Sequence, residues 1–285
     1  MTTISLLLLA LLCAACLSWG PGTHLEYAAR VHSRRDELGP DRARLIDQHR
    51  DAYDYGNLAA DIINIKAWGG HYNHCHRWGI VEEMRALATD ERDEAFILGY
   101  LSHLAADTIA HNHFVPYHLA RYRRGTKGLG HLFWELSADR LAPDVHWARI
   151  GELKRNDELD PLDDLVNRTV AKKALPMRTN KLLFDHVLLV SERDAWRARM
   201  DKLLPRERVA LDEEFLEGFR AAAVERVLLA LSPGGIELLA HVDTNGKLAQ
   251  AEALAVRAVD RAAADAFLEG MQSPPPGHGA TPHWD

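Results

Sequence analysis

Cysteine is scarce in this chain. Only three cysteines occur among 285 residues, and two of them, Cys13 and Cys16, lie in the apolar segment that opens the sequence. If that segment is removed, Cys75 is the one cysteine left, which excludes a disulfide framework within the mature monomer. The chain then needs another source of stability, and a bound metal is one candidate.

Long apolar runs are also few. The longest covers residues 4–16, shorter than the ~20 residues of a membrane-spanning helix, and no second run approaches that length. It fits a signal peptide ending in the small-residue pattern Cys16-Leu17-Ser18, although no Lys or Arg precedes it. We therefore expect residues 1–18 to be a signal peptide, and the mature protein, secreted or periplasmic, to begin at Trp19 without a transmembrane segment. An uncleaved anchor or a wrongly assigned start is the alternative.

Basic charge and strand patterns are missing as well. The chain has 34 Lys and Arg against 41 Asp and Glu, a formal net charge of −7, whereas nucleic-acid binders usually carry a basic face. We expect no stable nucleic-acid binding. Alternation of β-branched residues with a period of two does not extend over a useful length, while helical periodicity is frequent. These patterns predict an all-α protein.

Histidine, in contrast, is abundant: half of the 16 histidines lie between His71 and His131. In "HLAADTIAHNH", His103 and Asp107 are four residues apart and share one helix face, which His111 continues. His113 lies further round, but Pro116 follows and can loosen the helix there. The neighbours are apolar almost all round, which is typical of a central helix, and buried His and Asp need partners such as metal ions. A solvated polar stripe is the alternative.

Two further stretches carry residues of the same kinds. "HLFWE" places His131 and Glu135 four residues apart, and Asp61 precedes His74 and His76. Nitrogen and carboxylate ligands without thiolates suit zinc in an open, catalytic arrangement. A closed structural site at residues 74–76 would usually need a second cysteine, which the mature chain lacks.

The stretch "SWGPGTH" at residues 18–24 suggests a ligand made by processing. Cleavage after Ser18 frees the α-amino group of Trp19, whose typical pKa of ~7.7–8.0 makes it far easier to deprotonate than a lysine at ~10.4. The amine and the carbonyl oxygen of Trp19 can chelate a metal ion in a five-membered ring, with His24 as a further ligand.

Taken together, these motifs resemble the zinc-dependent phospholipase C family, whose superfamily includes the S1/P1-type nucleases. The matching motifs are W-G-x-x-x-H at residues 19–24, H-x-x-x-D-x-x-x-x-x-H at residues 103–113 and H-x-x-x-E at residues 131–135. The resemblance implies a secreted all-helical enzyme: a multi-helix bundle around a buried cleft with three zinc ions. Together with the composition and the helical periodicity, it predicts a signal peptide at 1–18, a catalytic region at 19–160, a helical continuation of the same or a closely packed domain at 161–272 and a disordered, Pro/Gly-rich tail at 273–285.

The resemblance also implies a ligand set. The first zinc is held by Asp61, His103, Asp107 and either His74 or His76, with His74 narrowly preferred. The second is held by His113, His131 and Glu135, and the third by Trp19 and His24 with Asp107 as a bridge. His111 would support a ligand from outside the coordination sphere.

The implied activity is hydrolysis of a phosphodiester, most directly as a phospholipase C on phospholipid head groups. Asp61 is the candidate catalytic residue, which orients or deprotonates the attacking water. The short spacing from Trp19 to His24 is similar to the spacing in the nucleases. A Glu rather than an Asp at position 135 is similar to the phospholipases. The alternatives are therefore an S1/P1-like nuclease or other phosphodiesterase on the same three-zinc core, or a non-enzymatic zinc-stabilised helical protein.

Overall fold

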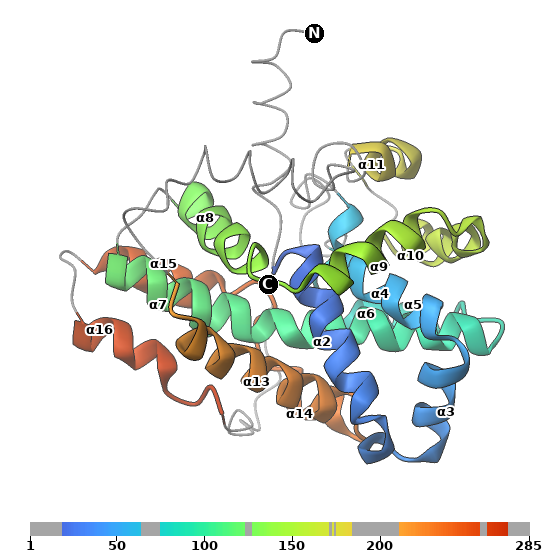
Figure 1. Cartoon of the computed structure of the whole chain (residues 1–285), viewed down its shortest axis with the longest axis horizontal. Coiled ribbons are helices and arrows are strands. Elements are labelled where there is room, and N and C mark those ends of the chain that lie inside the picture. Colours follow the sequence, from blue (N-terminus) through green and yellow to red (C-terminus); the bar gives the residue numbers. More distant parts are fainter. Residues whose placement is uncertain are drawn as a thin grey trace, which may run out of the picture.

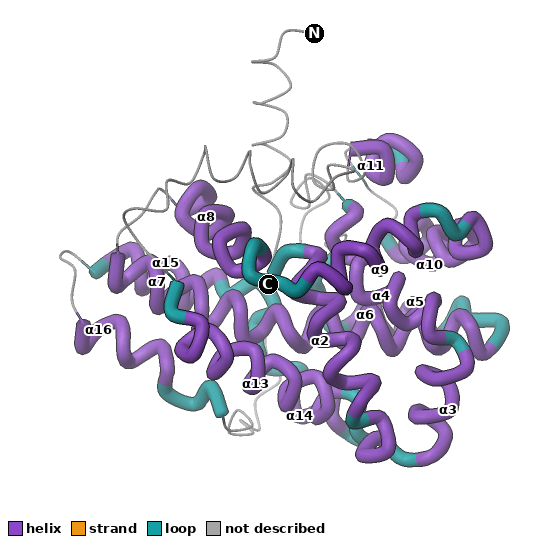
Figure 2. The backbone as a smooth tube through the Cα atoms, viewed as in Figure 1, coloured by secondary structure: helices purple, strands orange, loops and turns teal. Residues whose placement is uncertain are grey.

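A computed structural model of the whole chain shows an assembly of helices (Figures 1 and 2). It describes residues 19–63, 75–122, 127–170, 173, 175–183, 211–256 and 261–272. No strand occurs in these ranges, so the prediction of an all-α protein is confirmed. None of the helices described there is long and apolar enough to cross a membrane. The predicted signal peptide, His74 and the predicted tail lie outside the described residues.

The described helices fall into two sets along the chain, those before residue 184 and those after residue 210. Those before residue 184 are α2 (Pro21–Ser33), η1 (Arg35–Leu38), α3 (Pro40–Gln48), α4 (Arg50–Ile62), α5 (Gly79–Arg85), α6 (Glu91–Ile109), the turn η4 (Ala110–Phe114), α7 (Val115–Tyr122), α8 (Lys127–Asp139), α9 (Asp144–Lys154), η5 (Asp157–Leu162), α10 (Asp163–Thr169) and α11 (Met177–Leu183). Those after residue 210 are α13 (Glu213–Ala230), α14 (Gly235–Leu239), α15 (Lys247–Ala255), α16 (Arg261–Asp265) and η8 (Ala266–Leu268).

Helix α6 runs through the middle of the molecule (Figure 1). All of its residues from Ala95 to Ile109 are buried, as expected for a helix that is apolar almost all round. Its N-cap residue is Asp90, whose carboxylate accepts the Asp93 N–H at 2.9 Å. Helices α4 and α13 pack along α6, and α2, α3 and α5 also contact it. Since α13 also contacts α2, the C-terminal part of the chain packs directly on the helices of the N-terminal part.

Two glycines bring α4 and α6 unusually close together. A Cβ on Gly99 would lie 2.0 Å from the Tyr53 carbonyl oxygen, and a Cβ on Gly56 would lie 2.1 Å from the Phe96 carbonyl oxygen. The two helix backbones therefore touch where these glycines meet. One turn further along, this approach allows the His103 Nδ1–H on α6 to donate to the Asn57 carbonyl on α4 at 2.8 Å.

We expect Gly99→Ala to lower the free energy of unfolding by about 3 kcal/mol or more, because the added methyl group meets backbone that cannot move aside. Urea unfolding measures the change. Gly218→Ala on α13 is the matched control, since nothing lies within 4 Å of its Cβ position. That substitution should be neutral or stabilising by up to ~1 kcal/mol through helix propensity alone. Equal effects of the two substitutions would contradict this account of the α4–α6 contact.

Candidate metal centre

Five of the predicted ligands meet at the centre of the fold, and we call them the first group. His24 comes from α2, Asp61 from the end of α4, His76 from the turn before α5, and His103 and Asp107 from α6. Within each of two triads, His24–His103–Asp107 and Asp61–His76–His103, one ligand atom per residue lies within 4.8 Å of the others. No side chain of the group is more than 3% exposed.

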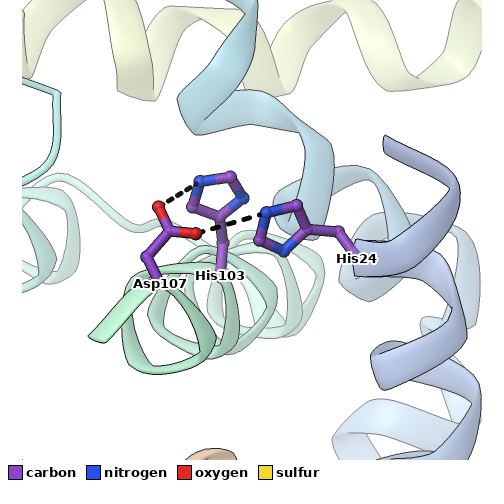
Figure 3. Close-up of side chains that lie close together, drawn as sticks. All are labelled: His24, His103 and Asp107. Carbon is purple, nitrogen blue, oxygen red and sulfur yellow. Dashed lines mark ion pairs between the residues drawn. The ribbon is translucent and has the colours of Figure 1, made fainter. Parts of the chain in front are cut away.

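Asp107 is the centre of the first group. Its Oδ1 lies 3.4 Å from His24 Nε2, and its Oδ2 lies 3.0 Å from His76 Nε2 and 3.2 Å from His103 Nε2. Figure 3 shows the carboxylate turned toward both His103 and His24. The rings of His24 and His103 stack with their centroids 3.9 Å apart. One carboxylate thus faces three imidazoles.

The environment sets the charge of this group. Burial lowers the pKa of His103 to about 4, so this imidazole is neutral at neutral pH. Burial alone would raise the pKa of Asp107, but the neighbouring histidines, His103 foremost, hold it well below its ordinary value. A neutral imidazole beside an anionic carboxylate is the ionisation state that a metal ion requires of these ligands.

Three residues form a second group beside the turn η4. His131 Nε2 on α8 lies 2.7 Å from Glu135 Oε1, and His111 Nε2 on η4 lies 3.4 Å from the same oxygen. Glu135 is fully buried, and the two rings have centroids 5.0 Å apart. All three residues offer ligand atoms within 4.8 Å of one another.

Hydrogen bonds on the far side of each ring fix the proton positions in the second group. His111 Nδ1 donates to the Thr244 carbonyl, and His131 Nδ1 donates to Gln250 Oε1 at 3.0 Å. In both rings Nδ1 is thus bound to an oxygen of another part of the chain, and Nε2 is the ring nitrogen turned toward the Glu135 carboxylate.

A cation bound between these side chains would satisfy buried polar atoms that otherwise lack a partner. Among the described residues, buried atoms without a hydrogen-bond partner include both ring nitrogens of His24, both carboxylate oxygens of Asp107 and of Glu135, and Nε2 of His111. Burying such atoms without a partner lowers the stability of the folded protein. Imidazole nitrogens and carboxylate oxygens without thiolates are the ligands of catalytic zinc sites, so the residues fit zinc.

The structure corrects one residue of the predicted ligand set. His113 was expected beside His131 and Glu135, but its Nδ1 donates to the Phe267 carbonyl at 2.8 Å and it belongs to neither group. His111, expected outside the coordination sphere, lies there instead. The reason is local: His103, Asp107 and His111 are each four residues apart, and the π-helical turn η4 leaves His113 on another face. That four-residue spacing was the sequence signal for His111.

The predicted N-terminal ligands lie on one short stretch. His24 reaches the first group from the first turn of α2, and Trp19 is fully buried, with its ring centroid 4.5 Å from that of Phe114 at the end of η4. Of the two alternatives after Asp61, His76 lies in the first group.

Asp139, which we did not predict, holds the start of α2 in place. Its Oδ1 accepts the backbone N–H of Thr23 at 2.8 Å and the Thr23 hydroxyl at 2.9 Å. Asp139 thus caps α2 from α8, because the N-cap residue Gly20 has no side chain to do so. Burial raises the pKa of this carboxyl to about 6. Asp139 lies one helical turn after Glu135, so the cap links the helices that carry His24 and Glu135.

Comparison with known proteins identifies the family. Searches of curated proteins and of solved structures each found no match. A family model described as zinc dependent phospholipase C matches residues 23–177, more than half of the 285 residues. The matched region includes every member of the two groups. This chain therefore belongs to the zinc-dependent phospholipase C family, as the motifs around His103 and His131 indicate.

Proposed function

We propose that this protein is a secreted phospholipase C, a zinc-dependent hydrolase that releases phosphorylated head groups from phospholipids. The observation that carries the proposal is the pair of buried groups in which imidazole nitrogens and carboxylate oxygens face one another. Membership of an enzyme family defined by zinc-dependent phospholipase C activity supports the substrate class.

Three zinc ions are proposed, with ligands that follow the geometry of the two groups. The first ion is assigned to Asp61, His76, His103 and Asp107, and the second to His111, His131 and Glu135. His24, Asp107 and the processed N terminus of Trp19 are assigned to the third. When bound, zinc polarises phosphoryl oxygens, lowers the pKa of a bound water and stabilises the leaving oxygen.

The chain's own residues prepare this chemistry. Asp61 Oδ1 lies 3.5 Å from His76 Nε2 and 3.7 Å from His103 Nε2, at the edge of the first group. We assign Asp61 the role of orienting and deprotonating the attacking water, a task suited to a carboxylate. Because His103 is neutral and Asp107 is anionic, these two side chains present acceptors rather than protons to the other side chains of the first group.

The test uses protein that has been secreted and processed naturally. Its N-terminal sequence and zinc content are determined together, and it is then given phosphatidylcholine vesicles and single-stranded DNA in parallel. We expect a start at Trp19, three zinc ions per chain and release of phosphocholine that a chelator abolishes. Cleavage of DNA with intact vesicles would replace the phospholipase by a nuclease on the same core. One zinc or fewer without turnover would leave a zinc-stabilised helical protein.

A further inference from the structure

We infer that residues 242–250, which lie beyond the region matched by the family model, position the second group by hydrogen bonds to the Nδ1 atoms of its two histidines. We call these residues the buttress segment. They comprise the turn between α14 and α15 together with the first turn of α15. The inference rests on the proposed function and deepens it. A part of the chain that supplies no metal ligand would hold the proposed ligands in position.

Gln250 fixes the tautomer of His131. The Gln250 Nε2 group donates to the Asn245 carbonyl at 3.0 Å, an atom that can only accept. The amide oxygen of Gln250 must therefore be the atom that lies 3.0 Å from His131 Nδ1. It follows that Nδ1 carries a proton and that Nε2 is the ring nitrogen turned toward Glu135. Gln250 is itself buried, at 4% exposure, so this orientation is held.

The buttress segment holds His111 in the same way, but through its backbone. The Thr244 carbonyl accepts the proton of His111 Nδ1, and the Asp243 carbonyl accepts from Asn112 Nδ2 at 2.7 Å. Two successive residues of η4 are thus bound to two successive carbonyls. Gly246 allows the close approach: its φ is +57°, and a Cβ there would lie 2.1 Å from the His111 carbonyl oxygen.

The same segment reaches the chain of the first group. The Thr244 hydroxyl donates to the His76 carbonyl at 2.7 Å, and Asn245 Nδ2 donates to the same oxygen at 3.1 Å. Nearby, Trp78 Nε1 donates to the Val242 carbonyl at 2.9 Å. The buttress segment therefore contacts the backbone at His76 in the first group and the side chains of His111 and His131 in the second.

Internal hydrogen bonds stabilise the conformation of the segment. The Asp243 carboxylate accepts from the backbone N–H groups of Asn245 and Lys247, each at 2.8 Å. These contacts fix the turn that starts α15, and α15 in turn packs on α7, η4 and α8. A segment held in this way can orient ligands, since partners of ligating histidines typically contribute 10–100-fold to metal affinity.

Two substitutions of Gln250 test the inference. Gln250→Met removes both the acceptor for His131 and the donor to the Asn245 carbonyl at similar length, whereas Gln250→Glu loses only the donor and keeps an oxygen for His131. We expect Gln250→Met to lower the affinity for one of the bound zinc ions by about 10–100-fold in chelator competition. Gln250→Glu should retain the affinity for that ion. In the zinc-free protein, the nitrogen chemical shifts of His131 should show a proton on Nδ1, and Gln250→Met should redistribute it between the two nitrogens. Unchanged zinc affinity in Gln250→Met, or equal loss in both variants, would overturn the inference.

A glycine pair provides an independent test through the backbone. Gly246→Ala forces a methyl group against the His111 carbonyl, whereas Gly234→Ala meets nothing within 4 Å although its φ is also positive, at +74°. Both substitutions carry the cost of the left-handed conformation, so their difference reports the contact with η4. We expect zinc affinity to fall at least about 10-fold only for Gly246→Ala. Equal zinc affinity in the two folded variants would contradict a role for the segment in holding His111.

The outcomes separate this inference from the proposed function. If the unsubstituted protein binds no zinc, the proposed function fails, while the His131 nitrogen shifts still decide whether Gln250 sets its tautomer. If the protein binds zinc and releases head groups but Gln250→Met and Gly246→Ala leave zinc affinity unchanged, the inference alone fails.

Discussion

Asn in place of Asp107 is expected to release zinc from the first group and to reduce phospholipid hydrolysis on the order of 10³-fold or more. The effect is large because this carboxylate faces His24, His76 and His103 at 3.0–3.4 Å. Among the described residues, no other carboxylate lies within 3.4 Å of all three imidazoles. An amide keeps the shape of the side chain but removes the negative charge and presents a donor toward the Nε2 lone pair of His103.

Zinc content and head-group release, measured on the same preparation, check this prediction. The matched control is Asp163→Asn, because Asp163 is also buried but bonds to the Tyr55 hydroxyl at 2.6 Å and to Lys181 at 3.0 Å, away from both groups. The control should keep its zinc and its activity even if it loses some stability. If Asp107→Asn kept full zinc content and activity, the assignment of Asp107 as a shared ligand would be wrong.

Removal of zinc is expected to lower the stability of the unsubstituted protein by about 4 kcal/mol or more. That figure applies to a single ion supplied at ~1,000 times its dissociation constant, and further ions add to it. For a domain of this size it corresponds to a fall in melting temperature of roughly 10 °C. The physical reason is that buried polar atoms of His24, Asp107, His111 and Glu135 then lack a partner.

Thermal unfolding followed against chelator concentration measures this effect. Zinc added in excess of the chelator should restore the melting temperature, whereas magnesium should not, since imidazole nitrogen is a poor ligand for magnesium. A melting temperature that stays constant while zinc analysis shows complete removal would mean that the two groups satisfy each other by protons alone.

Local patterns explain what could be predicted from the sequence. The helices were predictable because the apolar residues recur with the helical period, and α6 stood out as central since its residues 95–109 are apolar almost all round. His103 with Asp107, and His131 with Glu135, were predictable as pairs because four-residue spacing on a helix decides their relative position without any tertiary contact. His24 followed from the resemblance of its short motif.

Tertiary contacts account for what could not be predicted. Whether His111 or His113 faces Glu135 depends on the π-helical turn at residues 110–114, and such a turn has no distinct local signature. Gln250 and Asp139 act on residues more than 100 positions away, on His131 and Thr23 respectively. An isolated Gln or Asp in a helical pattern gives no sign of such a contact, so only the packing of α8 and α15 identifies them.

The Asp139 cap has a consequence for the rate at which metal leaves the protein. An ion in a buried group escapes only when a local opening exposes it, and the first turn of α2, which carries His24, is a natural place for such an opening. Fraying of that turn breaks the contacts from Thr23 to Asp139 on α8, the helix that also carries Glu135. We therefore expect the exchange of zinc in the two groups to be kinetically linked through Asp139, which belongs to neither group.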